Sequence, residues 1–311
     1  MKKVFFNIEN VIAYVLGYII KYLPRYIKFN LYVILVKMSW KFPLRVRVLL
    51  SPFFMELGRI SLDNGGPFWI KKNFEGFVMK LDISEKTQRN LFFMKVYEES
   101  LTKFIRKQIH NGDRFIDIGA NVGYYTMLSS SLGTNTISCE PEKGNFNLLS
   151  NNSQLNGFKP NLRNIAIGSK KGNMTLHINP LNHGGNSLLP FLNYKTGIHG
   201  YSREDVEKKF GRENLEQEVL VDTIDSLVGS QNIKVIKIDV EGFESDVIFG
   251  MVETLKNKRV SYIICELSNI ETRNSIIDMM DRVYGYSVNT VDNDGNLVSG
   301  DKGRDLVFAV R

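Results

Sequence analysis

The sequence predicts an α/β protein in which strands and helices alternate around a mostly parallel, Rossmann-like sheet. Two stretches carry this prediction, because each is a short apolar run that ends in an acid and continues into a glycine-containing turn and a potential helix start. These stretches lie at 115–125 and 235–244. Further strand and helix patterns alternate around them, and two short apolar runs on either side of 292–295 predict a terminal hairpin.

The other elements are expected in chain order around these two stretches. We expect helices over 82–97, 95–110, 124–132, 145–156, 194–217, 245–255 and 270–284. We expect short strands around Gly76 and strands over 135–139, 162–168, 260–266, 287–291 and 306–310. The segment 174–187 interrupts the alternation with turn residues, and loops of this kind often carry substrate contacts.

Length and composition allow one large domain with an extension. The chain has 311 residues, of which 43% are hydrophobic, so it can bury a sizeable core. We expect an N-terminal extension of amphipathic helices and a small cap over 1–95, and the main domain over 96–311. The formal net charge is +7, but residues 1–50 hold nine Lys and Arg and one acid, so the rest is close to −1. Nucleic acid is therefore a poor partner for the main domain.

Residues 1–50 are apolar, basic and rich in aromatics, but their longest uncharged run, at 10–20, has 11 residues. A spanning helix needs about 20 apolar residues, and a secretory signal needs an unbroken apolar core, so we expect neither. Two interpretations of this arm stay open: it packs on the main domain, or it attaches peripherally to the inner face of the cell membrane. We expect a cytoplasmic protein in both cases, with Cys139 and Cys265 as buried free thiols.

The turn at 117–125 has the properties of a cofactor-binding loop. Gly119 and Gly123 allow positive φ and let a ligand lie against the backbone. A helix that starts here directs N–H groups at the ligand, so the loop suits a ligand with a negative end. The pyrophosphate of a dinucleotide and the carboxylate of S-adenosylmethionine both fit. The dinucleotide fingerprint has a glycine where this chain has Asn121, which disfavours the dinucleotide.

Residues after the next two strands complete the expected cofactor site. Glu140 ends the second strand, 23 residues after Asp117, which is where a nucleoside ribose presents its hydroxyl groups. The alternative is a surface glutamate before a proline turn. Asn164 and Ala166 follow in the third strand, where they would border an adenine ring.

Asp239 and Glu241 follow the second informative strand. Ligands of parallel sheets bind where the strand order reverses, so Asp239 and Asp117 would share one site if their strands flank that point. As a general base we expect Asp239, then Glu241, then His183. The alternatives are acids that cap the following helix and a structural or solvated histidine. No histidines or cysteines have ligand spacing, so no dedicated metal site is expected.

Together these stretches resemble the FkbM-type family of class I S-adenosylmethionine-dependent methyltransferases. The motifs occur in the family's order: D-I-G-A-N-V-G-Y-Y-T at 117–126, E-P at 140–141, N-I-A-I-G at 164–168, G-G-N-S-L at 184–188, D-T-I-D-S-L at 222–227, K-I-D-V-E-G-F-E at 237–244 and C-E-L at 265–267. Each motif alone is weak, and the ordered set is strong. The resemblance covers 110–311 and leaves residues 1–95 outside it.

The resemblance implies a seven-stranded sheet with an antiparallel last strand, S-adenosylmethionine as cofactor, and O-methylation of a small-molecule or glycan acceptor. It implies that the methionine end of the cofactor is lined by Asp117, Gly119, Asn121 and Gly123, and the ribose by Glu140. A base would take the hydroxyl proton as the oxygen attacks the methyl carbon. Three alternatives stay open: an NAD-dependent oxidoreductase, a non-catalytic, membrane-associated cofactor-binding module, and an N- or C-methyltransferase. The D/N-P-P-Y-type amine signature is absent from the sequence. The acceptor and the oligomeric state are not predicted.

Overall fold

The computed structural model describes residues 15, 18–20, 22–62, 66–180, 182–189, 207, 208, 211, 214–267, 270–303 and 305–311. The chain forms two compact units. Unit 1 consists of residues 1–74, 78–97 and 181–184, and unit 2 consists of residues 75–77, 98–180 and 185–311. The helix predicted over 194–217 lies mostly outside the described residues, and its last two positions belong to a strand.

Unit 2 is built on a sheet of eight strands in the order β12-β11-β13-β10-β9-β3-β4-β5. Its strands are β3 Arg114–Ile118, β4 Asn135–Cys139, β5 Asn161–Arg163, β9 Ile233–Ile238, β10 Val260–Glu266, β11 Tyr286–Val291, β12 Leu297–Ser299 and β13 Asp305–Val310. β5, β4, β3, β9 and β10 are parallel, and β13 is antiparallel to both of its neighbours. The predicted mostly parallel sheet with an antiparallel last strand is confirmed, and the short β12 is an additional edge strand.

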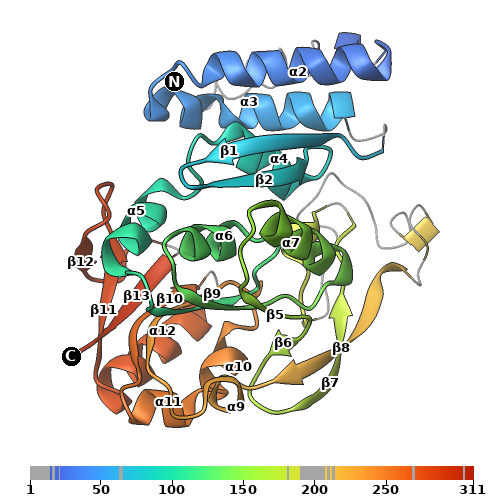
Figure 1. Ribbon diagram of the computed structural model, residues 1–311. Helices are drawn as coiled ribbons and strands as arrows, with labels where there is room; N and C mark the ends of the chain where they lie inside the picture. Colours follow the sequence, from blue (N-terminus) through green and yellow to red (C-terminus); the bar gives the residue numbers. More distant parts are fainter. Residues whose placement is uncertain are drawn as a thin grey trace. The chain divides into compact units, whose positions relative to one another are not determined.

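Helices cover both faces of this sheet (Figure 1). One face carries α5 Glu99–Gln108, α6 Tyr124–Ser131 and α7 Lys143–Leu155, and the other carries α9 Ile224–Val228, α10 Glu244–Phe249, α11 Val252–Lys256 and α12 Ile270–Asp278. Right-handed crossovers explain this division, because the chain runs from β3 toward β5 in one direction and from β9 toward β10 in the other. The strand order therefore reverses between β3 and β9, which are direct neighbours.

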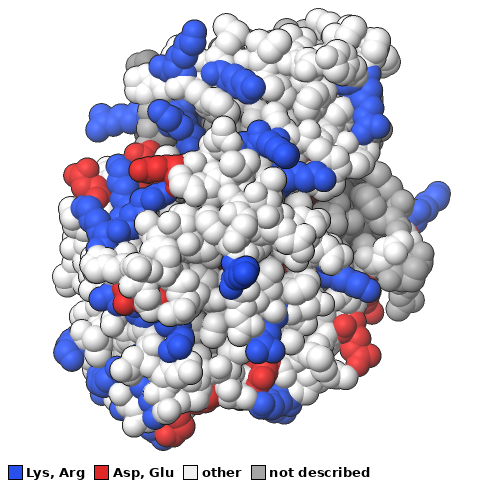
Figure 2. All heavy atoms as spheres, viewed as in Figure 1, with Lys and Arg blue, Asp and Glu red and all other residues white. Residues whose placement is uncertain are grey.

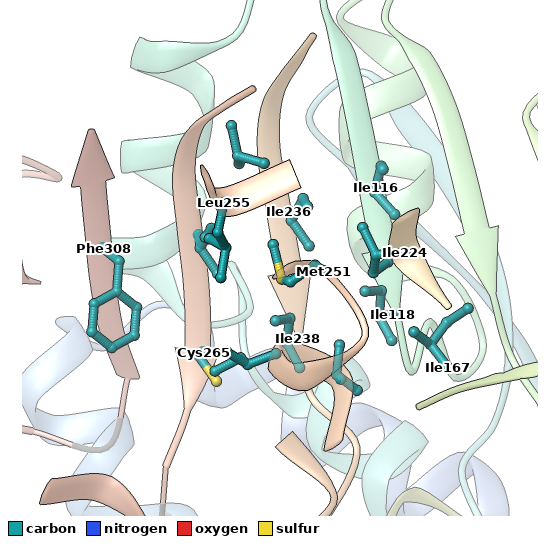
Figure 3. Close-up of a cluster of buried hydrophobic side chains, with 14 of the residues drawn as sticks. Ile116, Ile118, Ile167, Ile224, Ile236, Ile238, Met251, Leu255, Cys265 and Phe308 are labelled. Carbon is teal, nitrogen blue, oxygen red and sulfur yellow. The ribbon is translucent and has the colours of Figure 1, made fainter. Parts of the chain in front are cut away.

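An apolar core holds these two strands in place (Figure 3). Ile116 of β3 and Ile236 of β9 are fully buried in one cluster with Met251 and Leu255 from the helical layer. Burial of side chains of this size stabilises the folded state by roughly 1.5–3 kcal/mol each. Because β3 and β9 are fixed by this packing, the polar residues that follow them have defined positions.

The cysteines agree with the sequence-based expectation. Cys139 and Cys265 are buried free thiols at the carboxyl ends of β4 and β10. β3 and β9 lie between those two strands in the sheet.

The single strand predicted over 162–168 is wrong. Its first part is β5, but its second part is β6 Ala166–Ile167, which belongs to a separate three-stranded sheet with β7 Gly172–His177 and β8 Glu216–Asp222. β8 pairs with β7 in an antiparallel manner along one edge, and β6 pairs with the other edge of β8 in parallel. Gly168 extends this pairing, because its N–H donates to the carbonyl oxygen of Asp222 at 2.9 Å.

Two predicted helices are interrupted. The helix over 245–255 is two helices, α10 and α11, because the Gly250 carbonyl accepts the N–H of Asp225 at 3.0 Å. The Asp225 carboxylate accepts two N–H groups at the start of α11 and caps it. The helix over 270–284 is α12 followed by a π-helix at Met279–Val283.

Unit 1 is formed mainly by helices. It contains α2 Arg25–Ser39, α3 Leu44–Leu62, most of the hairpin formed by β1 Trp69–Phe74 and β2 Phe77–Asp82, and α4 Lys86–Phe93. The hairpin turns at Gly76, as predicted, whereas the helix expected over 82–97 is only the shorter α4. The buried ammonium of Lys72 donates to the Leu91 carbonyl at 2.6 Å, which closes the end of α4. Among the described residues, no helix is long and apolar enough to cross a membrane.

Candidate active site at the ends of β3 and β9

Three residues with positive φ shape the turn between β3 and α6. Gly119, Asn121 and Gly123 have φ values of +77°, +50° and +97°. Asn121 tolerates this conformation, and its side-chain oxygen accepts the N–H of Val122 at 2.6 Å. A Cβ on Gly119 would lie 1.8 Å from the backbone oxygen of Asp239. The turn after β3 therefore lies directly against the end of β9, as the sequence predicted.

Asp117 connects strand β3 to helix α6. Its side chain is 2% exposed and accepts a hydrogen bond from the Thr126 hydroxyl at 2.7 Å. Burial raises the pKa of Asp117 to about 6, and the charge of Lys237 and the Thr126 hydrogen bond oppose that rise. Asp117 thus joins β3 to the first turn of α6, and its contact with the methionine end of a cofactor stays a prediction.

Glu140 connects the end of β4 to the same turn. Its carboxylate accepts the N–H of Asn121 at 2.8 Å and the N–H of Glu142 at 2.9 Å. Burial raises the pKa of Glu140 to about 8, although both backbone hydrogen bonds oppose the rise. The side chain is buried and is not the exposed glutamate of the alternative interpretation.

The two residues expected near an adenine ring have different surroundings. The Asn164 amide donates to the carbonyl oxygens of Glu140 and Pro141 at 2.8 and 3.0 Å, so it holds the turn after β4. Ala166 lies in β6 and packs in a small apolar cluster with Val221. The structure thus joins Asn164 to Glu140 and places Ala166 in the second sheet.

Asp239 follows β9 and is paired with a lysine of that strand. Lys237 Nζ lies 2.8 Å from Asp239 Oδ2, and the two side chains are 5% and 28% exposed. Asp117 is the register partner of Lys237 in the neighbouring strand. Burial alone lowers the pKa of Lys237, but the carboxylates of Asp239, Glu98 and Asp117 outweigh it and raise that pKa. A ligand at this edge can reach the partly exposed carboxylate more readily than the buried ammonium.

Two further residues beside Lys237 are missing from the sequence-based set. The ring of Tyr125 lies 4.8 Å from Lys237 Nζ, and its hydroxyl donates to the Glu98 carboxylate. Glu98 has a φ of +41°, which is uncommon for a residue other than glycine, and burial raises its pKa. In the sequence, Lys237 can be recognised as a candidate site residue because it is a lysine inside an apolar strand. Glu98 has no such signal, because its partners lie far away in the sequence.

Glu241 is an exposed residue of the turn after β9, with a φ of +52°. Its backbone carbonyl accepts the hydroxyl of Ser187 at 2.8 Å, which joins the G-G-N-S-L segment to this turn. Glu244, the first residue of α10, holds this turn, because its carboxylate accepts the N–H of Gly242 at 2.9 Å.

His183 belongs to unit 1, whereas Asp239 and Glu241 belong to unit 2. The backbone N–H of His183 donates to Glu85 at 3.2 Å, and residues 183–185 form one turn of 3-10 helix. The role of His183 as a base stays a prediction.

The site in unit 2 has an excess of acids. Lys237 interacts with the carboxyl groups of Glu98, Asp117 and Asp239, so one cation is surrounded by three acids. Such surroundings favour a ligand that carries positive charge. Among the described residues, no group of three or more His, Cys, Asp or Glu is placed to hold a metal ion.

The comparison with protein families decides the identity of this arrangement. The model of the FkbM methyltransferase domain matches residues 117–288, which is more than half of the chain. The chain belongs to the FkbM methyltransferase family. The match starts at Asp117 in β3, so it includes both the glycine turn and the turn after β9. A search of curated proteins found no match for this chain.

Solved structures resemble this chain at low sequence identity. The METTL16 methyltransferase domain is 12% identical, with a TM-score of 0.39 over 82% of this chain and 80% of that one. Precorrin-6y C5,15-methyltransferase from Geobacter metallireducens is 11% identical, with a TM-score of 0.36 over 80% and 97%. The 16S rRNA N2 G1207 methyltransferase of T. thermophilus, in complex with AdoMet and guanosine, is 9% identical, with a TM-score of 0.41 over 78% and 50%. The assignment of the class I fold rests on the strand order of the eight-stranded sheet and not on these structures.

Proposed function

We propose that this FkbM methyltransferase uses S-adenosylmethionine to methylate a hydroxyl group of a sugar in a glycan, glycolipid or related natural product. The contact between the two turns carries the proposal, because Gly119 lies against the Asp239 backbone at the point where the strand order reverses. Open α/β sheets bind their ligands at such points. A glycine turn and a partly exposed carboxylate thus lie at one edge of the sheet.

The chemistry of the turn fits S-adenosylmethionine better than a dinucleotide. S-adenosylmethionine carries a sulfonium and an ammonium group, which the acids around Lys237 attract, whereas they repel a pyrophosphate. Gly119 and Gly123 would line the methionine end, where an added side chain would meet neighbouring atoms. Glu140 would hold the ribose, because each of its oxygens accepts one N–H and keeps a further acceptor site. These observations disfavour the NAD-dependent oxidoreductase.

The proposed reaction requires a group that accepts a proton. When bound, S-adenosylmethionine supplies a methyl group that forms a bond to the acceptor oxygen as the bond to sulfur breaks, which leaves S-adenosylhomocysteine. Asp239 takes the hydroxyl proton as the new bond forms and later releases it to solvent. Lys237 donates to one oxygen of Asp239 and orients the other. Positioning by the two packed turns supplies much of the remaining rate enhancement.

A hydroxyl acceptor is favoured because a neutral amine can attack without prior loss of a proton, whereas a hydroxyl needs a base. The partly exposed carboxylate of Asp239 suits that need. The restriction to sugars rests on the family resemblance.

The test is methyl transfer by the purified full-length protein. S-adenosylmethionine with an isotope-labelled methyl group is incubated with panels of saccharides, extracted glycolipids and amine-bearing peptides, and products are identified by mass spectrometry. We expect S-adenosylhomocysteine together with label on a sugar oxygen. Label on nitrogen or carbon would contradict O-methylation, and cofactor binding without turnover on any panel would favour a non-catalytic module. Comparison of cellular glycans with and without the protein then identifies the natural acceptor.

A further inference from the structure

An exposed apolar surface in unit 1 takes no part in the proposed methyl transfer. Among the described residues, twenty large hydrophobic side chains are exposed, and twelve of these fall between residues 15 and 49. Single exposed apolar residues are ordinary, but a concentration in one segment marks a contact surface.

Helix α2 is apolar on two opposite sides. Tyr32 and Val36 are fully buried and attach the helix to unit 1. Ile27, Ile34 and Met38 are spaced by seven and four residues, so they share one side, and they are 49%, 54% and 58% exposed. We call these three residues the outer face of α2. A helix that is apolar all round is normally covered on all sides or lies in lipid.

Three more exposed aromatic side chains lie in the first turn of α2 and before it. Tyr18, Tyr22 and Tyr26 are four residues apart and 51%, 68% and 78% exposed. The hydroxyl of Tyr22 donates to that of Tyr18 at 3.0 Å, so the polar ends meet while the rings stay exposed. Tyrosine is enriched at the boundary between lipid and water because its ring is apolar and its hydroxyl is polar.

The charge around the outer face has one sign. Residues 22–55 contain six Lys and Arg and no acid. Lys37, Lys41 and Arg45 are exposed next to the apolar residues. Figure 2 shows blue and white atoms over α2. This combination complements a surface that is apolar inside and negatively charged outside.

We propose that the outer face of α2, with its tyrosines and lysines, binds the surface of an anionic lipid bilayer. The helix lies in the interface and does not cross it, since no described helix is long and apolar enough to span a membrane. A second copy of the chain is a weaker candidate, because a symmetric contact would bring Lys37 and Lys41 of one copy against the same cations of the other. The inference does not depend on the methyl transfer reaction.

Co-sedimentation of the full-length protein with vesicles tests the proposal. Vesicles contain phosphatidylcholine alone or with phosphatidylserine, at low and at high salt. We expect binding to the phosphatidylserine vesicles that weakens as salt is added. The double variant Lys37→Ala/Lys41→Ala should bind about 25-fold more weakly, because each lysine near the surface contributes about 1 kcal/mol.

The apolar contribution is tested with Ile34→Glu/Met38→Glu, which changes exposed residues only. We expect vesicle binding to fall about tenfold or more. The matched control is Leu220→Glu/Val283→Glu, which places the same charges on exposed residues of unit 2 and should bind as the wild type does. Circular dichroism and S-adenosylmethionine binding check that the variants are folded.

Three results would overturn the proposal. The first is the absence of binding of the wild-type protein to phosphatidylserine vesicles at low salt, and the second is equal binding by Ile34→Glu/Met38→Glu. The third is a wild-type dimer in analytical ultracentrifugation that becomes monomeric in this variant while vesicle binding is absent, which would assign the face to a second copy.

Discussion

The turn after β3 and the turn after β9 follow one sequence pattern but have opposite arrangements. Asp117 is the fourth residue of β3, whereas Asp239 directly follows β9, and each turn contains a non-glycine residue with positive φ, Asn121 in the first and Glu241 in the second. Asp117 is buried and bonded to the helix that follows it, whereas Asp239 is partly exposed and bonded to a lysine of its own strand.

The difference teaches that the position of an aspartate relative to the end of its strand, together with its neighbours, decides its role. A hydroxyl on α6 holds Asp117 inside the fold. Lys237 lies two residues before Asp239, so both side chains are on the same side of the strand, and the lysine orients the carboxylate at the edge of the sheet. The first turn is therefore a support for a cofactor, and the second supplies the proposed base.

The largest effect is expected at Asp239. Asp239→Asn keeps the shape of the side chain but removes the proton acceptor, so the rate of methyl transfer should fall about 10²–10⁴-fold. Binding of S-adenosylmethionine, measured by calorimetry, should be largely retained. Asp294→Asn in the β11–β12 turn is the matched control and should keep full activity. Near-normal turnover by Asp239→Asn would rule out its role.

Removal of the cation tests whether Lys237 unites the two turns. Lys237→Met leaves three acids without their shared partner, so the free energy of unfolding in urea at neutral pH should fall by about 3–5 kcal/mol. The loss should shrink in acid, where the carboxyl groups become protonated. Lys256→Met, which removes an exposed pair with Glu253, should cost less than about 1 kcal/mol. Equal losses in the two variants would contradict a central position of Lys237.

The pH dependence of stability tests the burial of Asp117. Its pKa of about 6 in the folded protein lies above the ordinary value of 3.8, so the ionised carboxylate opposes folding. This cost is absent below the ordinary value and complete above the folded value. Between those limits, rising pH should lower the free energy of unfolding of the wild type by about 3 kcal/mol relative to Asp117→Asn. A difference that stays constant or has the opposite sign would show that the carboxyl group is not held in its buried state.

The smallest effect is expected at Glu241. Glu241 is exposed and contributes its backbone carbonyl to Ser187, which a change of side chain leaves in place. Glu241→Gln should therefore change the rate of methyl transfer by less than about threefold, a range typical of exposed substitutions away from the chemistry. A loss as large as that of Asp239→Asn would move the assignment of the base to Glu241.

The sequence predicted those features that depend on local patterns. Two features could be predicted because each depends on a few consecutive residues: the glycine turn at 119–123 and the strands on either side of the switch point. The strand predicted over 162–168 failed, because the edge that β6 occupies is offered by β8, about fifty residues later.

The candidate site was only partly predictable for the same reason. The two turns were expected to share a site if their strands flank the switch point, and the backbones of Gly119 and Asp239 do pack against each other. The cluster around Lys237 includes Glu98 and Tyr125, whose contacts join three separate elements and leave no periodic signal. Likewise, no spacing in the sequence could show that His183 belongs to a different compact unit from the two turns.

The central claim is that the two turns together form a site for S-adenosylmethionine. Isothermal titration of the full-length protein with S-adenosylmethionine, and separately with NAD, tests this claim most directly. We predict saturable binding of S-adenosylmethionine at a single site, weakened in Glu140→Ala, and no binding of NAD. Binding of NAD without binding of S-adenosylmethionine would contradict the account.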